Sequence, residues 1–222
     1  MPDAITKPSA NAKSERMKAS FQNTRDQRYT ARLITEQTLW WKKLLDVQAP
    51  YRWNLLRLNP GFTLDIGCGV GRNLINLMGQ GVGIDHNPHS VEIARSHGLQ
   101  AFTSEEFLES PFNLSCTFDS ILLSHVAEHM TEQEAVILLR SYTHLLRAQG
   151  QVIIITPQEY GYRSDPTHVQ FMDFERLRNV AHRAGLIRVR EYSFPFPRIF
   201  GHLFKYNEFV SISKKSAATD SG

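Results

Sequence analysis

The chain has 222 residues, of which 41% are hydrophobic and 21% charged, a composition typical of a globular domain with an ordinary core. Its formal net charge of +3 is too small to indicate a nucleic-acid partner, and its apolar runs are too short to span a bilayer. Cys68 and Cys116 lie too far apart for a metal knuckle, and the first 20 residues hold no apolar signal segment. We therefore expect reduced thiols and a cytoplasmic location.

The N-terminal part divides into two segments. Residues 1–20 hold almost no large apolar side chains, so we expect a disordered tail there, and another at 216–222. Residues 21–60 show apolar side chains at helical spacing, interrupted by Pro50, which predicts N-terminal helices that could cover a site. Four aromatic residues of this segment could cover a pocket, but their helical spacing favours core packing. They are Trp40, Trp41, Tyr51 and Trp53.

Residues 61–215 alternate short apolar runs with helical patterns, which predicts an α/β domain with a doubly wound, mostly parallel sheet. Seven strands are expected, at Thr63–Ile66, Val82–Asp85, Gln100–Phe102, Phe118–Ser124, Gln151–Thr156, Ile187–Ser193 and Glu208–Ser213. Helices are expected near 72–79, 88–97, 104–109, 131–147 and 173–184. No clear helix joins the last two strands, so the last strand should pair antiparallel.

The stretch TLDIGCGVGRNL, residues 63–74, indicates a ligand-binding turn. A predicted strand ends at Ile66, and glycines follow at 67, 69 and 71. Glycines allow a sharp turn and a close approach of the backbone to a ligand. Asp85 ends the next predicted strand, where a carboxylate can reach ribose hydroxyls. The alternative is a glycine-rich turn that binds NAD or no ligand.

At these residues the sequence resembles the class I S-adenosylmethionine (SAM)-dependent methyltransferases, which have a Rossmann-like fold. The family's first motif, an acidic residue followed by G-x-G-x-G, is matched by Asp65, Gly67, Gly69 and Gly71. The resemblance implies that Asp85 binds both ribose hydroxyls and that Asp65 and Gly67 hold the methionine end of SAM. Many members place Asp in the adenine-reading turn after the third strand, where this chain has Thr-Ser-Glu. The residues expected to contact the cofactor are Asp65, Gly67, Cys68, Gly69, Gly71, Asp85, His86, Ser104, Glu105 and His125.

Residues 124–130, SHVAEHM, contain H-x-x-E-H, which binds zinc when both histidines share one helix face. Thr131 and Glu134 form a capping box, so the helix should begin only after the motif. The histidines then fall in a strand-to-helix connection, and we expect no metal. The family's fourth-strand motif often ends in a Glu-His pair, which Glu128 and His129 resemble. This resemblance places His125 beside the cofactor and His129 near methyl transfer; the alternative is that His129 only packs the loop.

The loop at 158–173 follows the fifth predicted strand and resembles the acceptor-side loop of small-molecule methyltransferases. Asp165 could orient the imidazole of His168, giving a base that accepts a proton from a hydroxyl. The alternative is a local turn at 164–166 with an ordinary Asp–His hydrogen bond. The candidate catalytic residues are therefore His129, His168 and Asp165.

The leading hypothesis is a SAM-dependent methyltransferase that acts on a small molecule, more readily at oxygen than at nitrogen. An RNA or protein methyltransferase is the first alternative, although the Asn/Asp-Pro-Pro-aromatic string of base N-methyltransferases and a Pro-Cys nucleophile are both missing. A non-catalytic SAM-binding protein is the second alternative, and a metallopeptidase the third. The sequence predicts no membrane partner, and it identifies neither the acceptor nor the oligomeric state.

Overall fold

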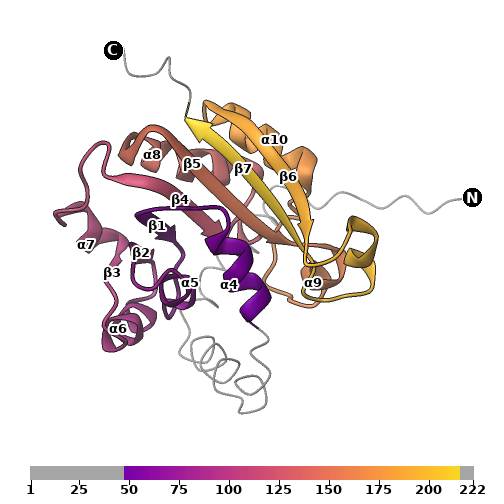
Figure 1. Cartoon of the computed structure of the whole chain (residues 1–222), viewed down its shortest axis with the longest axis horizontal. Helices are drawn as coiled ribbons and strands as arrows, with labels where there is room; N and C mark the ends of the chain where they lie inside the picture. Colours follow the sequence, from indigo (N-terminus) through magenta and orange to yellow (C-terminus); the bar gives the residue numbers. More distant parts are fainter. Residues whose placement is uncertain (1–47, 216–222) are drawn as a thin grey trace, which may run out of the picture.

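The computed structural model describes residues 48–215, whose seven strands form one sheet in the order β3-β2-β1-β4-β5-β7-β6 (Figure 1). β1 to β5 are mutually parallel, and β7 pairs antiparallel with both β5 and β6. The strands are β1 Thr63–Ile66, β2 Gly81–Asp85, β3 Ala101–Thr103, β4 Phe118–Ser124, β5 Leu146–Pro157, β6 Leu186–Phe194 and β7 Glu208–Lys215. The predicted fold class and the antiparallel last strand are confirmed.

Helices cover both faces of the sheet. They are α4 Ala49–Leu56, α5 Arg72–Asn76, α6 Pro88–Ser96, α7 Ser104–Leu108, α8 Glu132–Tyr142, α9 Glu159–Arg163 and α10 Phe174–Arg183, with 3-10 turns η1 Ala127–His129, η2 Thr143–Leu145 and η3 Arg198–His202. One core joins α7, α8 and α10 to the sheet. A second core lies against the opposite face beneath α4, which crosses the front of the sheet in Figure 1.

β4 illustrates why both faces are covered. Ile121 and Leu123 enter the core beneath α8, whereas Leu122 enters the core beneath α4, because successive side chains of a strand alternate between faces. All three side chains are fully buried. Such continuous apolar runs are typical of parallel strands buried on both faces.

The sheet topology collects several chain segments at one edge. β1 pairs with β2 on one side and with β4 on the other, so the strand order reverses beside β1. Ligands of such sheets bind beyond the carboxyl ends of the strands at this position. Because β7 runs in the opposite direction, its first residue, Glu208, pairs with Pro157 at the carboxyl end of β5. The start of β7 therefore lies at the same edge as the ends of the parallel strands.

Several expected boundaries differ from those observed. The helix expected at 131–147 gives way to η2 and then β5, because Leu146 already pairs with Phe118 of β4. The loop after β5 contains α9, and the segment before β7 contains η3.

The N-terminal predictions lie mostly outside the described residues, as do both expected tails. Pro50 lies in the first turn of α4, a position suited to proline, which lacks an N–H. Tyr51 packs edge-on against Phe194 at 5.5 Å between ring centroids. Trp53, expected in the core, is instead 58% exposed, and the guanidinium of Arg57 lies 4.7 Å from its ring centroid. Because the side chains of Trp53 and Arg57 both lie at the surface, they can form this cation–π contact.

Candidate functional site

The glycine loop between β1 and α5 adopts a conformation that favours glycine at three alternate positions. Gly67, Gly69 and Gly71 have φ angles of +75°, +54° and +86°, in the region that other residues rarely adopt. The amides of Gly67 and Cys68 both donate to the carbonyl of Ile84, which fixes the loop to β2. The predicted turn is therefore present at the carboxyl edge of the sheet.

Asp85, at the end of β2, is held by main-chain amides. Its Oδ2 accepts a hydrogen bond from the Gly69 amide at 2.8 Å, and its Oδ1 accepts one from the Asn87 amide at 2.9 Å. Each carboxylate oxygen can accept more than one hydrogen bond. Asp85 is thus oriented beside the glycine loop with capacity for a pair of hydroxyl donors, as ribose binding requires.

Asp65 in β1 is fully buried and has one oxygen, Oδ2, without a hydrogen-bond partner among the described residues. Its Oδ1 accepts a long hydrogen bond of 3.4 Å from the side chain of Asn73. Burial raises the pKa of Asp65 to about 7. A buried carboxyl group with an unpaired oxygen fits a cationic or hydrogen-bond-donating ligand such as the ammonium group of SAM.

The remaining predicted cofactor residues are placed differently. Cys68 has its side chain buried in a small core with Leu74 and Val91, where burial raises the pKa of the thiol. Its Sγ occupies the space above Gly83, where a built Cβ would lie 2.5 Å from it. The contact of Cys68 with the cofactor stays a prediction.

Three more of these residues lie at the ends of β2 and β3. His86 has its Nδ1 3.5 Å from Asp85 Oδ1. Ser104 and Glu105 begin α7 after β3, partly buried and exposed respectively. All three are near the expected adenosine side of the site, and their contacts with the cofactor stay predictions.

The SHVAEHM segment leaves β4 at Ser124 and turns at once. His125 has a φ angle of +60°, and its amide donates to the carbonyl of Ile155 at 2.9 Å. η1 follows as a single 3-10 turn, and α8 begins only after Thr131, whose capping box with Glu134 is formed as predicted. His125 and His129 are therefore not one turn apart on an α-helix, which is the geometry that the H-x-x-E-H zinc motif needs.

Val126 brings this segment into direct contact with the glycine loop. A Cβ built on Gly67 would lie only 2.4 Å from Val126 Cγ2, so only a residue without a side chain fits beneath Val126. The expected cofactor loop and the histidine-bearing loop consequently share one surface at the β1–β4 boundary.

His125 lies between two carboxylates. Its Nε2 is 2.8 Å from Glu208 Oε1, and its Nδ1 is 3.3 Å from Glu128 Oε1. Burial disfavours the charged imidazole, but both carboxylates outweigh burial and raise the pKa of His125 to about 9. At neutral pH His125 is therefore an imidazolium that connects β4 to the start of β7.

His129 and His168 meet next to this ion pair. Their ring centroids lie 4.9 Å apart, although the residues come from η1 and from the loop after α9. The amides of Val169 and Gln170 both donate to the Glu128 carbonyl, at 2.8 Å and 3.1 Å. These two hydrogen bonds hold the loop against η1.

Asp165 and His168 each make other hydrogen bonds, and their predicted pairing stays a prediction. Nδ1 of His168 lies 2.7 Å from the carbonyl oxygen of Tyr162, and Asp165 Oδ1 accepts hydrogen bonds from the amide and hydroxyl of Thr167 at 3.0 Å and 2.7 Å. Thr167 in turn holds His129, whose Nδ1 is 3.3 Å from the Thr167 carbonyl. Asp165 is therefore linked to His129 through Thr167.

Sequence reasoning missed two residues of this site. Glu208 lies 83 positions from His125, although the expected antiparallel last strand does imply that its first residue lies at the carboxyl edge of the sheet. Asn73, which contacts Asp65, lies in the first turn of α5. Its amide was indistinguishable from that of any other helical surface residue in the sequence.

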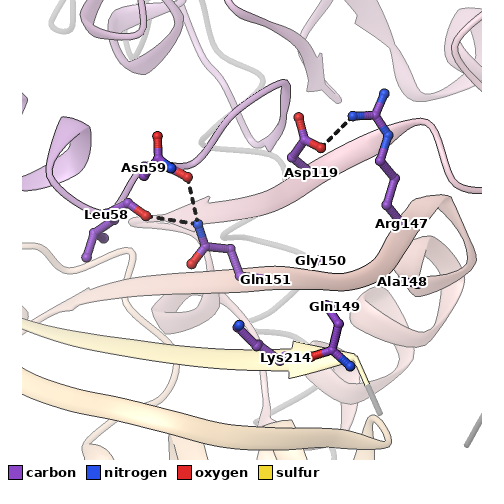
Figure 2. A pocket seen from close by; sticks show the side chains of 9 residues that line it. All are labelled: Leu58, Asn59, Asp119, Arg147, Ala148, Gln149, Gly150, Gln151 and Lys214. Atoms are coloured by element: carbon purple, nitrogen blue, oxygen red, sulfur yellow. Dashed lines mark hydrogen bonds and ion pairs between the residues drawn. The ribbon is translucent and has the colours of Figure 1, made fainter. Parts of the chain in front are cut away.

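A cavity of about 360 Å³ lies at the opposite edge of the sheet (Figure 2). Asp119 and Arg147 form an ion pair there, at 2.5 Å between Oδ1 and Nη1, near the start of β4 and β5. Gln151 donates to the carbonyls of Leu58 and Asn59, which ties the connection between α4 and β1 to β5. These contacts stabilise the sheet, and the cavity is separate from the glycine loop.

Comparison with known proteins gives a consistent result. A family described as "Methyltransferase domain" matches residues 41–190. Over 101 residues the chain is 30% identical to a ubiquinone biosynthesis O-methyltransferase of Xanthomonas oryzae pv. oryzae. That match covers 42% of this chain and 41% of the relative, so the chain spans less than half the length of this curated protein.

Two solved structures share the fold. A SAM-dependent methyltransferase from Archaeoglobus fulgidus superimposes with a TM-score of 0.61 and 21% identity, over 78% of this chain and 97% of the other. The 1,6-didemethyltoxoflavin-N1-methyltransferase of Burkholderia thailandensis, with bound 1,6-didemethyltoxoflavin and S-adenosylhomocysteine, gives a TM-score of 0.61 at 16% identity. That match covers 97% of this chain and 94% of the other.

Proposed function

Since the chain belongs to the SAM-dependent methyltransferase family, we propose that it transfers a methyl group from SAM to a hydroxyl oxygen of a small molecule. The observation that supports this most directly is the contact between Gly67 and Val126. It places the acidic and glycine-rich half of the site against the half that contains the histidines. A donor and an acceptor bound in these two halves would be neighbours, as a direct displacement requires.

On the donor side, the roles of Asp85 and Asp65 follow from their surroundings. Asp85, fixed by the amides of Gly69 and Asn87, is proposed to accept hydrogen bonds from both ribose hydroxyls. Asp65, with its unpaired buried oxygen, is proposed to receive the ammonium group of the methionine end. SAM supplies a sulfonium-bound methyl group that an acceptor nucleophile can displace.

On the acceptor side, His129 supports oxygen as the nucleophile. Burial lowers the pKa of His129 below its usual value, so its imidazole is neutral at pH 7. A hydroxyl group has a high pKa and gains reactivity when it loses its proton, whereas an amine needs no such help. A neutral imidazole at His129 beside the donor site therefore suits a hydroxyl acceptor. The name of the Xanthomonas relative also denotes an O-methyltransferase.

A binding experiment and an activity experiment test this proposal. Calorimetric titration of the purified chain should show SAM binding, and no binding at millimolar SAM would contradict the cofactor assignment. Labelled SAM is then incubated with the protein and separate RNA, protein and metabolite fractions. We expect the labelled methyl group in the metabolite fraction. Mild base would release it from a methyl ester but not from a methyl ether, which identifies the kind of product. Label in RNA or protein would favour the macromolecular alternatives, and binding without label in any fraction would favour a non-catalytic SAM-binding protein.

Partners and location stay predictions. No helix within residues 48–215 has the length and apolar character needed to cross a membrane. The small-molecule acceptor and the cytoplasmic location were expected from the sequence and stay predictions, and light scattering would measure the oligomeric state.

A further inference from the structure

Glu128, His129 and His168 form a compact group of ligand atoms at the acceptor side of the site. One carboxylate oxygen and one imidazole nitrogen from each histidine all lie within 4.8 Å of one another. The group unites η1 with the loop after α9, and the amides of Val169 and Gln170 fix the two segments together. The arrangement is therefore held by the main chain rather than by the side chains themselves.

Both imidazoles are oriented by a main-chain carbonyl. His168 Nδ1 lies 2.7 Å from the carbonyl of Tyr162, and His129 Nδ1 lies 3.3 Å from that of Thr167. A carbonyl only accepts hydrogen bonds, so each Nδ1 donates to its carbonyl and Nε2 is the nitrogen left for a ligand. A carbonyl partner on the distal nitrogen is the usual support of a histidine that binds a metal ion.

Glu128 is the buried member of the group. Its Oε1 lies 3.3 Å from His125 Nδ1, but neither of its oxygens accepts an aligned hydrogen bond from the described residues. A buried carboxyl group with oxygens left in this state fits a bound cation or a set of hydrogen-bond donors.

His125 is shared between two carboxyl groups, Glu128 and Glu208. On the other side of Glu128, His168 Nε2 lies 4.0 Å from Oε1. A cation placed among the three side chains would be bound by both imidazole nitrogens and the carboxylate.

We propose that Glu128, His129 and His168 bind a divalent cation of the zinc class. Two imidazoles and one carboxylate are a ligand set of catalytic zinc sites, and they leave a fourth position open. Zinc–ligand bonds of about 2.0–2.1 Å place tetrahedral ligands about 3.3 Å apart. The ligand atoms lie within 4.8 Å of one another, so the three side chains must close by up to about 1.5 Å. This is a different set from the His125 and His129 pair of the H-x-x-E-H motif, for which no metal was expected.

The cation site deepens the proposed function and rests on it for its catalytic role. A hydroxyl oxygen in the open position would lose its proton more readily, because a bound divalent cation lowers the pKa of an oxygen ligand. The acceptor oxygen would then face the donor side across the contact between Val126 and Gly67. The acceptor class that follows is a hydroxyl compound able to bind a metal ion through oxygen.

The test measures metal binding directly. The full chain, stripped with a chelator, is titrated with Zn²⁺ by calorimetry and with Co²⁺ by visible absorption. Wild type should bind about one ion per chain. His168→Gln and Glu128→Gln should each lower the affinity at least tenfold, while His182→Gln, at an exposed histidine of α10, should bind like wild type.

SAM titration of the same proteins distinguishes the two proposals and reports folding. We expect the ligand variants to keep the wild-type SAM affinity. If wild type binds SAM but no zinc, or if His168→Gln and Glu128→Gln bind zinc as tightly as wild type, the cation site is wrong while the proposed function stands. If wild type binds zinc but not SAM, the proposed function is wrong and the cation site stands.

Discussion

Replacement of Gly67 by alanine isolates the contact that joins the two halves of the site. The new Cβ meets two separate costs. The φ angle of +75° belongs to the left-handed region, which costs a residue with a side chain about 1–2 kcal/mol. The Cβ would also lie 2.4 Å from Val126 Cγ2, and such overpacking costs about 1–3 kcal/mol. Gly67→Ala should therefore lower the free energy of unfolding by roughly 2–5 kcal/mol.

A matched glycine separates the two costs. Gly79 has nearly the same φ angle, +74°, and nothing lies within 4 Å of a Cβ built on it. Gly79→Ala should therefore show only the backbone cost of about 1–2 kcal/mol. Val126→Ala should remove the steric cost, so the double variant Gly67→Ala with Val126→Ala should be more stable than the sum of the single effects predicts.

Urea denaturation measures the stabilities, and calorimetry measures SAM affinity in the variants that stay folded. Gly67→Ala should weaken SAM binding at least tenfold, since the loop must move away from Val126, whereas Gly79→Ala should leave the affinity unchanged. Equal destabilisation by the two glycine substitutions, or no positive coupling with Val126→Ala, would refute the reasoning that the segments are in tight contact.

Three further predictions concern charged groups. Asp85→Ala should weaken SAM binding at least about 100-fold, because two hydrogen bonds to a charged acceptor contribute about 1.5–3 kcal/mol each. Unchanged affinity in calorimetry, with exposed Glu92→Ala as control, would remove Asp85 from the ribose role. The pKa of Asp65 is raised from 3.8 to about 7, so Asp65 ionises at lower pH in the unfolded chain than in the folded one. The free energy of unfolding should therefore fall by up to about 4 kcal/mol as pH rises from 4 to 7. Asp65→Asn should abolish this fall in urea titrations at several pH values and should weaken SAM binding; a parallel pH profile in the variant would contradict the assignment. The pKa of His125 is raised from 6.5 to about 9. Charged His125 therefore contributes fully to the free energy of unfolding below pH 6.5, and this contribution of up to about 3 kcal/mol should be lost as pH rises through 9. His125→Gln should show a smaller loss over that range, and an equal loss would exclude His125 as the source.

The features that were correctly predicted from sequence depend on local patterns. The capping box of Thr131 and Glu134 lies within four residues, and it correctly placed the start of α8 after the histidine motif. Short apolar runs that alternate with helical patterns predicted the parallel sheet, because strands covered by helices on both faces need continuous apolar runs. Asp85 at the end of β2 was equally a local inference from a strand followed by a turn.

The features that the sequence did not indicate depend on which segments pack together. Asp165 and His168 are close in sequence, yet Asp165 accepts hydrogen bonds from Thr167, and His168 Nδ1 lies beside the carbonyl of Tyr162. Nothing in the local pattern ranks these partners. The approach of His168 to Glu128 and of Glu208 to His125 arises from the folded sheet, and spacing along the chain contains no signal for either pair.

The position of β7 has a consequence for how the domain is made. β7 leaves the ribosome after β5 and β6, yet it lies between them in the sheet. Until it is inserted, β5 has an open hydrogen-bonding edge and β6 has no strand partner within the described residues. Exposed edges of this kind promote association between chains. We therefore expect the half-synthesised domain to depend on chaperones, and Glu208 to reach His125 only in the final step of folding.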